Sequence, residues 1–154
     1  MKGEKAVIQQ LNKVLTCELT SINQFFLHAR IFGNWGFEQL NEKAYKKSIK
    51  DMKQADKLIE RILLLEGLPN LQHLDRLRIG ENPKEMLEAD LGFVTDELTL
   101  LKDAILVCET AADYVSRELL EDLLEYEEEY LDWLETQLQL IDSLGTENYL
   151  QSMM

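Results

Sequence analysis

The apolar residues of this chain recur at steps of three and four over most of its length, and no useful stretch alternates between apolar and polar positions. Such a period is typical of helices that bury one face, so we predict an all-α protein. Glycine, asparagine and proline interrupt the pattern and mark the ends of the elements. The predicted helices cover residues 5 to about 34, a second span ending at Leu65, a third opened by Pro83, a fourth capped by Asp113 and running to about Leu144, and a short tail from Glu147 to Met154.

The connection between the second and third predicted helices, residues 67 to 82, is long and rich in turn-forming residues. It includes Gly67 and Gly80 and has the length to traverse a bundle, and Asn82 can cap the helix that follows. Four long helices with short, long and short connections describe a ferritin-like four-helix bundle with one long crossover, here with a short fifth C-terminal helix. We expect residues 1–154 to form this single domain.

Three predicted core stripes carry a carboxylate among apolar residues: Glu18 on the first helix, Asp51 on the second and Glu127 on the fourth. Burying an ionised carboxylate costs several kcal/mol unless a cation or hydrogen-bond donors compensate it. These acids therefore indicate either a metal site or a polar network. The stripe of the third helix, from Leu87 to Cys108, is predicted to carry no acid.

Two residues near these acids limit the kind of site that they can form. Gln54 follows the second-helix acid, and Tyr130 follows the fourth-helix acid, at the i, i+3 spacing of the Glu-x-x-His ligands of di-iron bundles. Neither position is a histidine. The acids could instead bond to Gln54, to Tyr130 and to one another, or hold a single weak cation. His28 and His73 are expected to have surface or satisfied roles.

A second apolar stripe on the second helix is displaced by one residue from the stripe that holds Asp51. It comprises Tyr45, Ile49, Met52, Asp56, Ile59 and Leu63, and the first helix has Leu19, Asn23 and Phe26 beside its core face. A helix that is apolar on two faces packs in two directions. We therefore expect an antiparallel pair of like subunits across this face, with an apolar object held between the partners.

The chain carries a formal net charge of -13 over 154 residues. This charge argues against nucleic-acid and membrane partners and suits a protein that attracts cations. No apolar stretch has the length of a membrane span, no signal peptide is evident, and Cys17 and Cys108 are isolated thiols, so a cytoplasmic location is expected. The lysines of the second helix form a solvated face or partly face a cavity; they are Lys43, Lys46, Lys47, Lys50, Lys53 and Lys57.

Five segments, spread from Met1 to the tail, resemble those of one known protein family. They are MKGEKAVIQQLNKVL, CELTSINQFFLHARIFGNWG, DMKQADKLIERILLLEGLPNLQ, DYVSRELLEDLLEYEEEYLDWLETQL and ENYLQ. The family is bacterioferritin, which builds a 24-subunit shell around a stored ferric mineral. It binds haem b at each two-fold subunit interface through one methionine from each partner. The resemblance implies that Met52, in DMKQAD, is the residue that binds the haem iron.

The same resemblance implies a haem pocket and a docking site for an electron donor. The pocket would be completed by Leu19, Ile22, Asn23, Phe26, Ile49, Ala55, Asp56 and Ile59. The implied donor is a small bacterioferritin-associated 2Fe–2S ferredoxin, whose docking positions are Leu68, Asn70, Leu71, Arg76, Leu77, Glu81 and Glu85. Electrons from this donor would reduce and release the stored iron.

The di-iron ferroxidase site of the family is matched only in part. Glu18 and Glu127 match it, whereas its other ligand positions carry Asp51, Gln54, Val94 and Tyr130. The set thus lacks both imidazoles and one bridging acid, which two bridged irons need. Lys46 and Lys50 stand at the family's inner-surface iron position, and Phe25 replaces a tyrosine that lies beside the centre in many members. The resemblance implies that the centre is disabled.

The sequence therefore favours an iron-storage subunit that binds haem b and relays electrons for iron release. A second, ferroxidase-competent subunit type would supply oxidation in a hetero-oligomeric shell. One alternative is a homomeric bacterioferritin in which Glu18, Asp51 and Glu127 still bind iron weakly and oxidise it slowly. Another is a helical interaction module with neither metal nor haem. Whether the chain is itself an enzyme stays open, because the family activity is ferroxidase and most of the ligands are missing.

Overall fold

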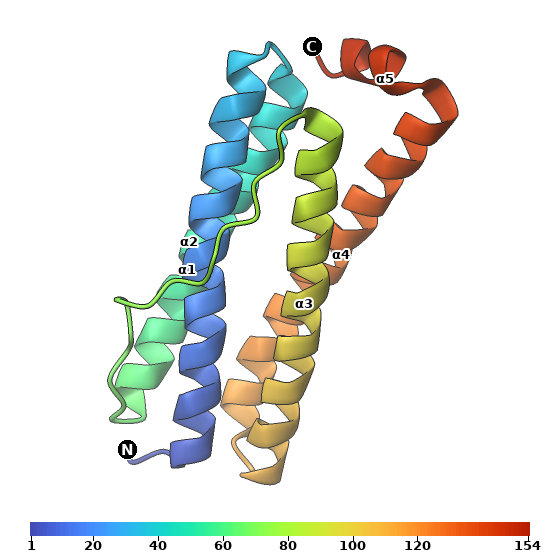
Figure 1. The fold of residues 1–154 in the computed structure, drawn as a ribbon. Coiled ribbons are helices and arrows are strands. Elements are labelled where there is room, and N and C mark those ends of the chain that lie inside the picture. The colour runs from blue at the N-terminus through green and yellow to red at the C-terminus, as the bar shows by residue number, and fades with distance from the viewer.

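A computed structural model describes residues 1–154, and every regular element in it is a helix. The elements are α1 (Lys5–Asn34), α2 (Glu38–Leu64), α3 (Pro83–Thr110), α4 (Tyr114–Leu144) and α5 (Thr146–Ser152), as Figure 1 shows. The all-α prediction is confirmed, and the predicted helix ends lie within a few residues of the observed ones.

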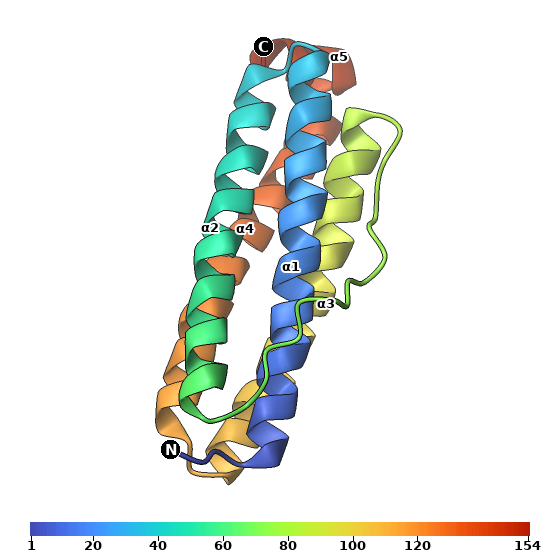
Figure 2. The same cartoon turned by 90° about the vertical axis from the view of Figure 1, so that its left-hand side faces the viewer.

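The four long helices form one bundle in which α1 and α2 are antiparallel, as are α3 and α4 (Figure 1). α1 packs chiefly against α2, and α3 against α4, while α1 also contacts α3. Residues 65–82 return along the outside of the bundle beside α1, so that α2 and α3 point in the same direction (Figure 2). This arrangement confirms the predicted ferritin-like bundle with one long crossover.

Side-chain caps fix where α3 and α4 begin. Asn82 accepts a hydrogen bond from a backbone N–H of the first turn of α3, and Pro83 is the first helical residue. Asp113 accepts from the backbone N–H of Ser116 at 3.0 Å and from the Arg61 guanidinium at 2.8 Å. The second bond ties the end of α2 to the start of α4, so the caps also align the two ends.

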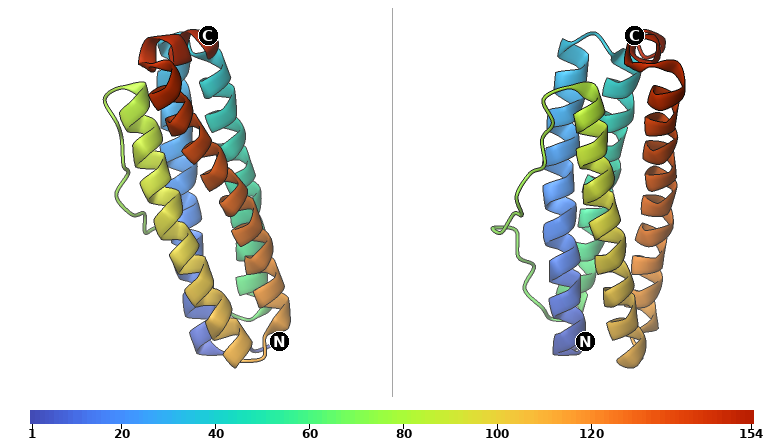
Figure 3. Two further views of the ribbon diagram at one scale, coloured as in Figure 1. Left: turned by 90° about the vertical axis from the view of Figure 1, so that its right-hand side faces the viewer. Right: turned by 45° about the vertical axis from the view of Figure 1, so that its right-hand side comes forward.

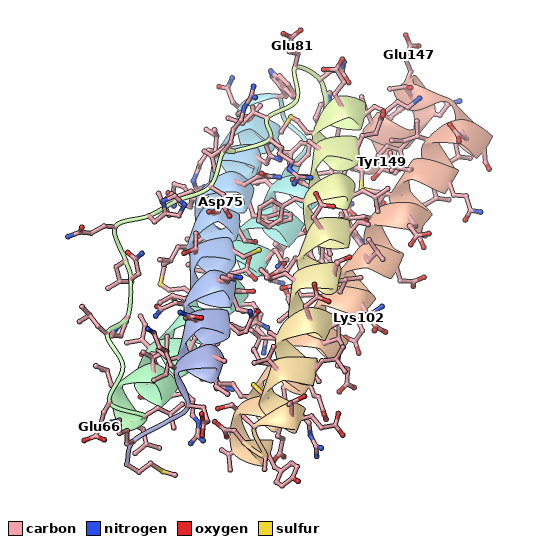
Figure 4. All side chains as sticks on the ribbon, turned by 60° about the horizontal axis from the view of Figure 1, so that its bottom comes forward. Glu66, Asp75, Glu81, Lys102, Glu147 and Tyr149 are labelled. Atoms are coloured by element: carbon pink, nitrogen blue, oxygen red, sulfur yellow. The ribbon has the colours of Figure 1, made fainter.

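Backbone donors of the crossover bond to buried side chains of α1. The N–H of Asp75 donates to the Thr20 hydroxyl, and the N–H of Arg78 donates to the Gln24 side-chain oxygen, each at 2.9 Å. Figure 4 shows Asp75 where the crossover passes α1 and Glu81 near the start of α3. The crossover is therefore held at defined points although it has no regular secondary structure.

The short helix α5 lies across the end of the bundle where α1 turns into α2 (Figure 3). Its Tyr149 is fully buried, and the Tyr149 hydroxyl donates to the side-chain oxygen of Gln137 at 2.7 Å. The backbone N–H of Gln39 donates to the carbonyl of Met153 at 3.0 Å. The C-terminal segment thus closes this end of the core.

The core consists of two apolar clusters separated by a layer of buried polar side chains. One cluster contains Phe25, Phe32 and Tyr149, and the other contains Leu11 and Leu120. On α2 and α4, the buried charged residues Lys47, Asp51 and Glu127 fall between positions of the two clusters. On α1 and α3, the buried acids Glu18, Asp90 and Glu97 lie among positions of the cluster that contains Phe25. The polar layer is the interior feature that needs an explanation.

No helix combines the length and the apolarity that a bilayer crossing requires.

Candidate functional site

One carboxylate from each long helix lies in the polar layer: Glu18 from α1, Asp51 from α2, Glu97 from α3 and Glu127 from α4. The burial of Glu18, Asp51 and Glu127, which their stripes predict, is confirmed. The prediction that the third helix brings no acid to the core is wrong, because Asp90 and Glu97 are both buried. The core face of a helix is wider than one row of side chains, and both acids lie beside the row that the prediction followed.

Lys47 occupies the middle of this layer and is fully buried. Its Nζ lies 2.6 Å from Oδ1 of Asp51 and 2.8 Å from Oε1 of Glu127, and it donates a hydrogen bond to each. The prediction that Lys47 belongs to a solvated or cavity-facing row of lysines is therefore wrong. The available signal was its position four residues before Asp51, because residues at i and i+4 share one face of a helix.

Aromatic rings surround the Lys47 ammonium on its remaining sides. Nζ lies 5.0 Å from the ring centre of Phe25, 5.2 Å from that of Tyr126 and 5.3 Å from that of Tyr130. Ring faces attract a cation at these distances, most strongly where water is excluded. Two carboxylates and three rings therefore hold the ammonium in one position.

The hydrogen bonds of the buried acids differ from the network that the sequence suggests. Asp51 accepts from the Ser21 hydroxyl and from Lys47. Neither Gln54 nor Tyr130 bonds to Asp51 or Glu127, and the side-chain oxygen of Gln54 has no donor at all. The cation in this layer is thus a lysine of the chain itself.

Charge in the layer is unbalanced, since four carboxylates face a single ammonium. Burial raises the pKa of Asp51 to about 6, although Lys47 acts in the opposite direction. Burial also raises the pKa of Glu18 and of Glu127 well above the usual value, and the neighbouring carboxylates add to both shifts. Burial would lower the pKa of Lys47, but its attraction to the acids raises that pKa well above its ordinary value. The ammonium therefore stays charged, and some of the acids bind protons.

Three of the acids present oxygens that no donor of the chain reaches. Both carboxylate oxygens of Glu18, both of Glu97 and Oε2 of Glu127 are buried and lack a hydrogen-bond partner. One oxygen from each of these three residues lies within 4.8 Å of the other two. Carboxylate oxygens grouped in this way are ligands for hard divalent cations.

The two histidines lie outside this group. The buried His28 has Nδ1 2.9 Å from Oδ1 of Asp90, which also accepts from the side-chain amide of Gln24. His73 is exposed on the crossover, 3.6 Å from Asp75. His73 has the surface role that was expected, whereas His28 is satisfied only at Nδ1, because its Nε2 is buried without a hydrogen-bond partner. No imidazole belongs to the group of acids.

The second stripe of α2 lies on the outside of the α1–α2 pair. The Met52 side chain is 53% exposed, and Phe26, Tyr45 and Leu63 are also exposed although they are large and apolar. Among the predicted pocket residues, Leu19, Ile22, Ile49 and Ile59 are partly buried, Asn23 and Asp56 are exposed, and Ala55 is buried. An exposed apolar face with a thioether at its centre is typical of a surface that a partner covers. Ala55 belongs to the core behind this face.

The crossover presents apolar side chains at the positions implied for an electron donor. Leu68 is 84% exposed, Leu71 is about half exposed, and Arg76 and Glu81 are also exposed. Leu77 is partly buried and lines a cavity under the crossover. These positions thus combine exposed leucines with charges of both signs.

Comparisons with known proteins agree with this fold. Residues 8–144 match the ferritin-like domain family. The chain is 47% identical to a bacterioferritin of Brucella melitensis over 149 residues, which is 97% of this chain and 92% of the relative. It is 46% identical to bacterioferritin BfrA of Mycobacterium tuberculosis, with 97% and 94% covered. It is also 46% identical to a bacterioferritin of Rhodobacter capsulatus, with 97% and 92% covered.

Proposed function

The chain belongs to the bacterioferritin family of iron-storage proteins, and we propose from this premise that it is a subunit type that binds haem b and leaves iron oxidation to a partner. Membership implies assembly with like subunits into a shell. The proposal separates two activities that share one helix. The inner face of α2 has lost its oxidation chemistry, and the outer face keeps a cofactor ligand.

The observation that carries the proposal is the position of Lys47. A pair of bridged irons needs carboxylates and imidazoles around two adjacent metal positions. Here the Lys47 ammonium bonds to the two acids, Asp51 and Glu127, that would have to turn toward such a pair. A fixed positive charge repels a metal cation from the same oxygens. The donor set therefore does not fit a di-iron centre, and we assign no oxidation step to it.

The outer face fits haem b. The thioether of Met52 is a soft ligand that suits haem iron, and a two-fold axis through the interface would supply the second Met52 from the partner. Partly buried Leu19, Ile22 and Ile59 offer the apolar surroundings that a porphyrin needs. Haem supplies reversible one-electron transfer when it is bound. The role of the chain is to hold it between two subunits and exclude water.

Two further partners complete the proposal. A second, ferroxidase-competent subunit type would oxidise ferrous iron, because this chain lacks the ligands. A 2Fe–2S ferredoxin would dock on the crossover to return electrons for iron release, with Leu68 and Leu71 buried in the contact and with Arg76 and Glu81 orienting it. The exposure of both leucines supports this surface.

Weak oxidation by a homomeric shell is the second candidate function. Glu97 favours it, because this residue adds an acid to the residual set of Glu18, Asp51 and Glu127. The candidate requires ferrous iron to be oxidised, however slowly, at the subunit interior without a second subunit type. The absence of imidazole and the position of Lys47 favour the first proposal.

Replacing Met52 by leucine tests the haem assignment. Met52→Leu should leave the shell assembled, because leucine has nearly the volume of methionine and such a replacement usually costs less than about 1.5 kcal/mol of stability. It should abolish the haem Soret band, because leucine offers no ligand to the iron. Met153→Leu, in the C-terminal segment, is the matched control and should keep the band. A Soret band of full strength in Met52→Leu would show that Met52 is not the residue that holds the haem.

A further inference from the structure

We propose that Glu18, Glu97 and Glu127 form a binding site for one hard divalent cation of the Mn²⁺ or Fe²⁺ class. This set differs from the residual set suggested by the sequence, because Glu97 of α3 replaces Asp51 of α2. It also requires no oxidation of the bound metal. The proposal is independent of the haem face.

The geometry of the three acids suits a single ion. One oxygen from each of Glu18, Glu97 and Glu127 lies within 4.8 Å of the other two. Two ligands at about 2.1 Å from an ion can be at most about 4.2 Å apart, so small rotations of the carboxylates bring all three into range. The oxygens come from α1, α3 and α4, which are fixed relative to one another by the apolar clusters on either side.

Unpartnered oxygens are the second, independent indication. Glu18 and Glu97 are at most 1% exposed, and none of their four carboxylate oxygens receives a hydrogen bond from an N–H or O–H group of the chain. A buried acceptor without a partner is costly, and it is costlier still when charged. A cation would satisfy all of these oxygens at once. The alternative way to satisfy these oxygens without a metal is a proton shared between two of the carboxyl groups.

Lys47 limits the site to one ion. It bonds to Asp51 and to Oε1 of Glu127. Oε2 of Glu127 has no partner, so it can bind a cation together with Glu18 and Glu97. The layer carries four carboxylates and one ammonium, so a single divalent cation brings it close to neutrality. A second divalent cation would approach the ammonium itself.

A cavity beneath the crossover extends from the surface to one of the three acids, Glu97. It has a volume of about 770 Å³, lies between the crossover, α1 and α3, and is lined by Glu97, Cys17, Asp75 and Asp96 among others. The side chains of Asp75 and Asp96 are more than half exposed, but Arg76 and Arg78 line the same cavity and Arg78 pairs with Asp96 at 2.6 Å, so the mouth carries charges of both signs. Glu97 is buried at the inner side of the same cavity. The cavity therefore brings solvent close to Glu97 from beneath the crossover, next to Cys17 and Phe93 of the first apolar cluster.

The donor chemistry selects the class of metal. All three ligands are carboxylates, which favour hard cations, whereas softer metals prefer imidazole or thiolate. Cys17 lines the cavity, but burial raises its pKa far above the usual value and Glu97 adds to the shift, so it remains a neutral thiol. His28 bonds to Asp90 and is not part of the group.

The test is a Mn²⁺ titration of the assembled, haem-free protein, followed by the electron paramagnetic resonance signal of free Mn²⁺. The site predicts one tight Mn²⁺ per chain in the parent protein and at least a tenfold loss of affinity in Glu97→Gln. Asp103→Asn removes an exposed carboxylate from the same helix and should bind as the parent does. Surface binding alone would give equal affinities in all three proteins and would overturn the proposal.

A second measurement, of the melting temperature, shows whether the Glu97→Gln variant still folds. Glu97→Gln keeps the shape of the side chain and removes a buried charge, so its melting temperature without metal should be no lower than that of the parent. Mn²⁺ should raise the melting temperature of the parent and of Asp103→Asn, but not that of Glu97→Gln. A parent protein with no metal-dependent shift would show that shared protons alone satisfy these acids. That result would leave the haem proposal unaffected.

Discussion

Asp51 and Met52 are neighbours in the sequence, yet they lie on different faces of α2. Asp51 is fully buried and bonds to Lys47, whereas Met52 is half exposed among apolar side chains. The inner face must balance its charge within the protein, and Lys47 does so in part. The outer face needs only an apolar surface and a thioether. Successive helical residues point about 100° apart, so one face of a helix can change its chemistry without altering the other.

Rebuilding the ferroxidase ligands is the strongest test of this separation. If only the missing ligands of the family's ferroxidase site mattered, four replacements would restore it: Asp51→Glu, Gln54→His, Val94→Glu and Tyr130→His. Because the Lys47 ammonium occupies the same layer, we expect rapid oxidation, faster than the parent by orders of magnitude, only when Lys47→Gln is added to the four. The measurement is the initial rate of ferrous oxidation by oxygen together with the iron-binding stoichiometry.

The four-fold variant is the control for the five-fold one. If the four replacements alone restore two-iron binding, Lys47 does not block the centre. If the five-fold variant assembles and remains as slow as the parent, the loss of ligands and the position of Lys47 do not explain the inactivity. Phe25, Lys46 and Lys50 would then be the next positions to change.

Removing Lys47 alone should destabilise the metal-free protein. Lys47→Gln leaves the acids of the layer without their only cation, and an uncompensated buried charge costs about 3 to 5 kcal/mol, less any relief from protonation. Denaturant unfolding with a chelator present measures this effect. The exposed Lys46, which pairs with Glu42 on the same helix, provides the control Lys46→Gln and should change stability little. Equal effects of the two replacements would show that Lys47 contributes no special stabilisation.

A smaller effect is expected on the pH dependence of stability. The pKa of Asp51 is about 6 in the folded protein, above its ordinary value, so between about pH 4 and pH 6 the folded chain holds a proton that the unfolded chain releases. The free energy of unfolding should therefore fall as the pH rises through this interval, by at most about 3 kcal/mol.

Asp51→Asn should flatten this part of the pH profile, measured by denaturant unfolding of the metal-free protein. Asp103→Asn, which removes an exposed acid of α3, accounts for the general effect of net charge. A profile for Asp51→Asn that runs parallel to that of the parent would show that Asp51 is ionised throughout this range.

Most of the fold could be predicted from the sequence, because it depends on local signals. Periodic apolar stripes, the cap residues Asn82 and Asp113 and the turn residues of the crossover each act within a few positions. The contents of the polar layer could not be predicted in full. Lys47 and Glu97 lie on different helices, and each belongs to a stretch that also carries exposed charged residues. Only the packing of the bundle shows that both side chains point inward.

The most direct test of the central claim is to add ferrous iron and oxygen to the homomeric protein after loading it with haem. One sample then reports on both faces of α2, since the Soret band monitors the haem and ferric absorbance monitors oxidation. We predict a Soret band at one haem for every two chains and no fast oxidation phase that saturates at two irons per chain. A saturating phase at that ratio in the haem-loaded homomer would contradict the account, because the interior of this chain would then be a working ferroxidase.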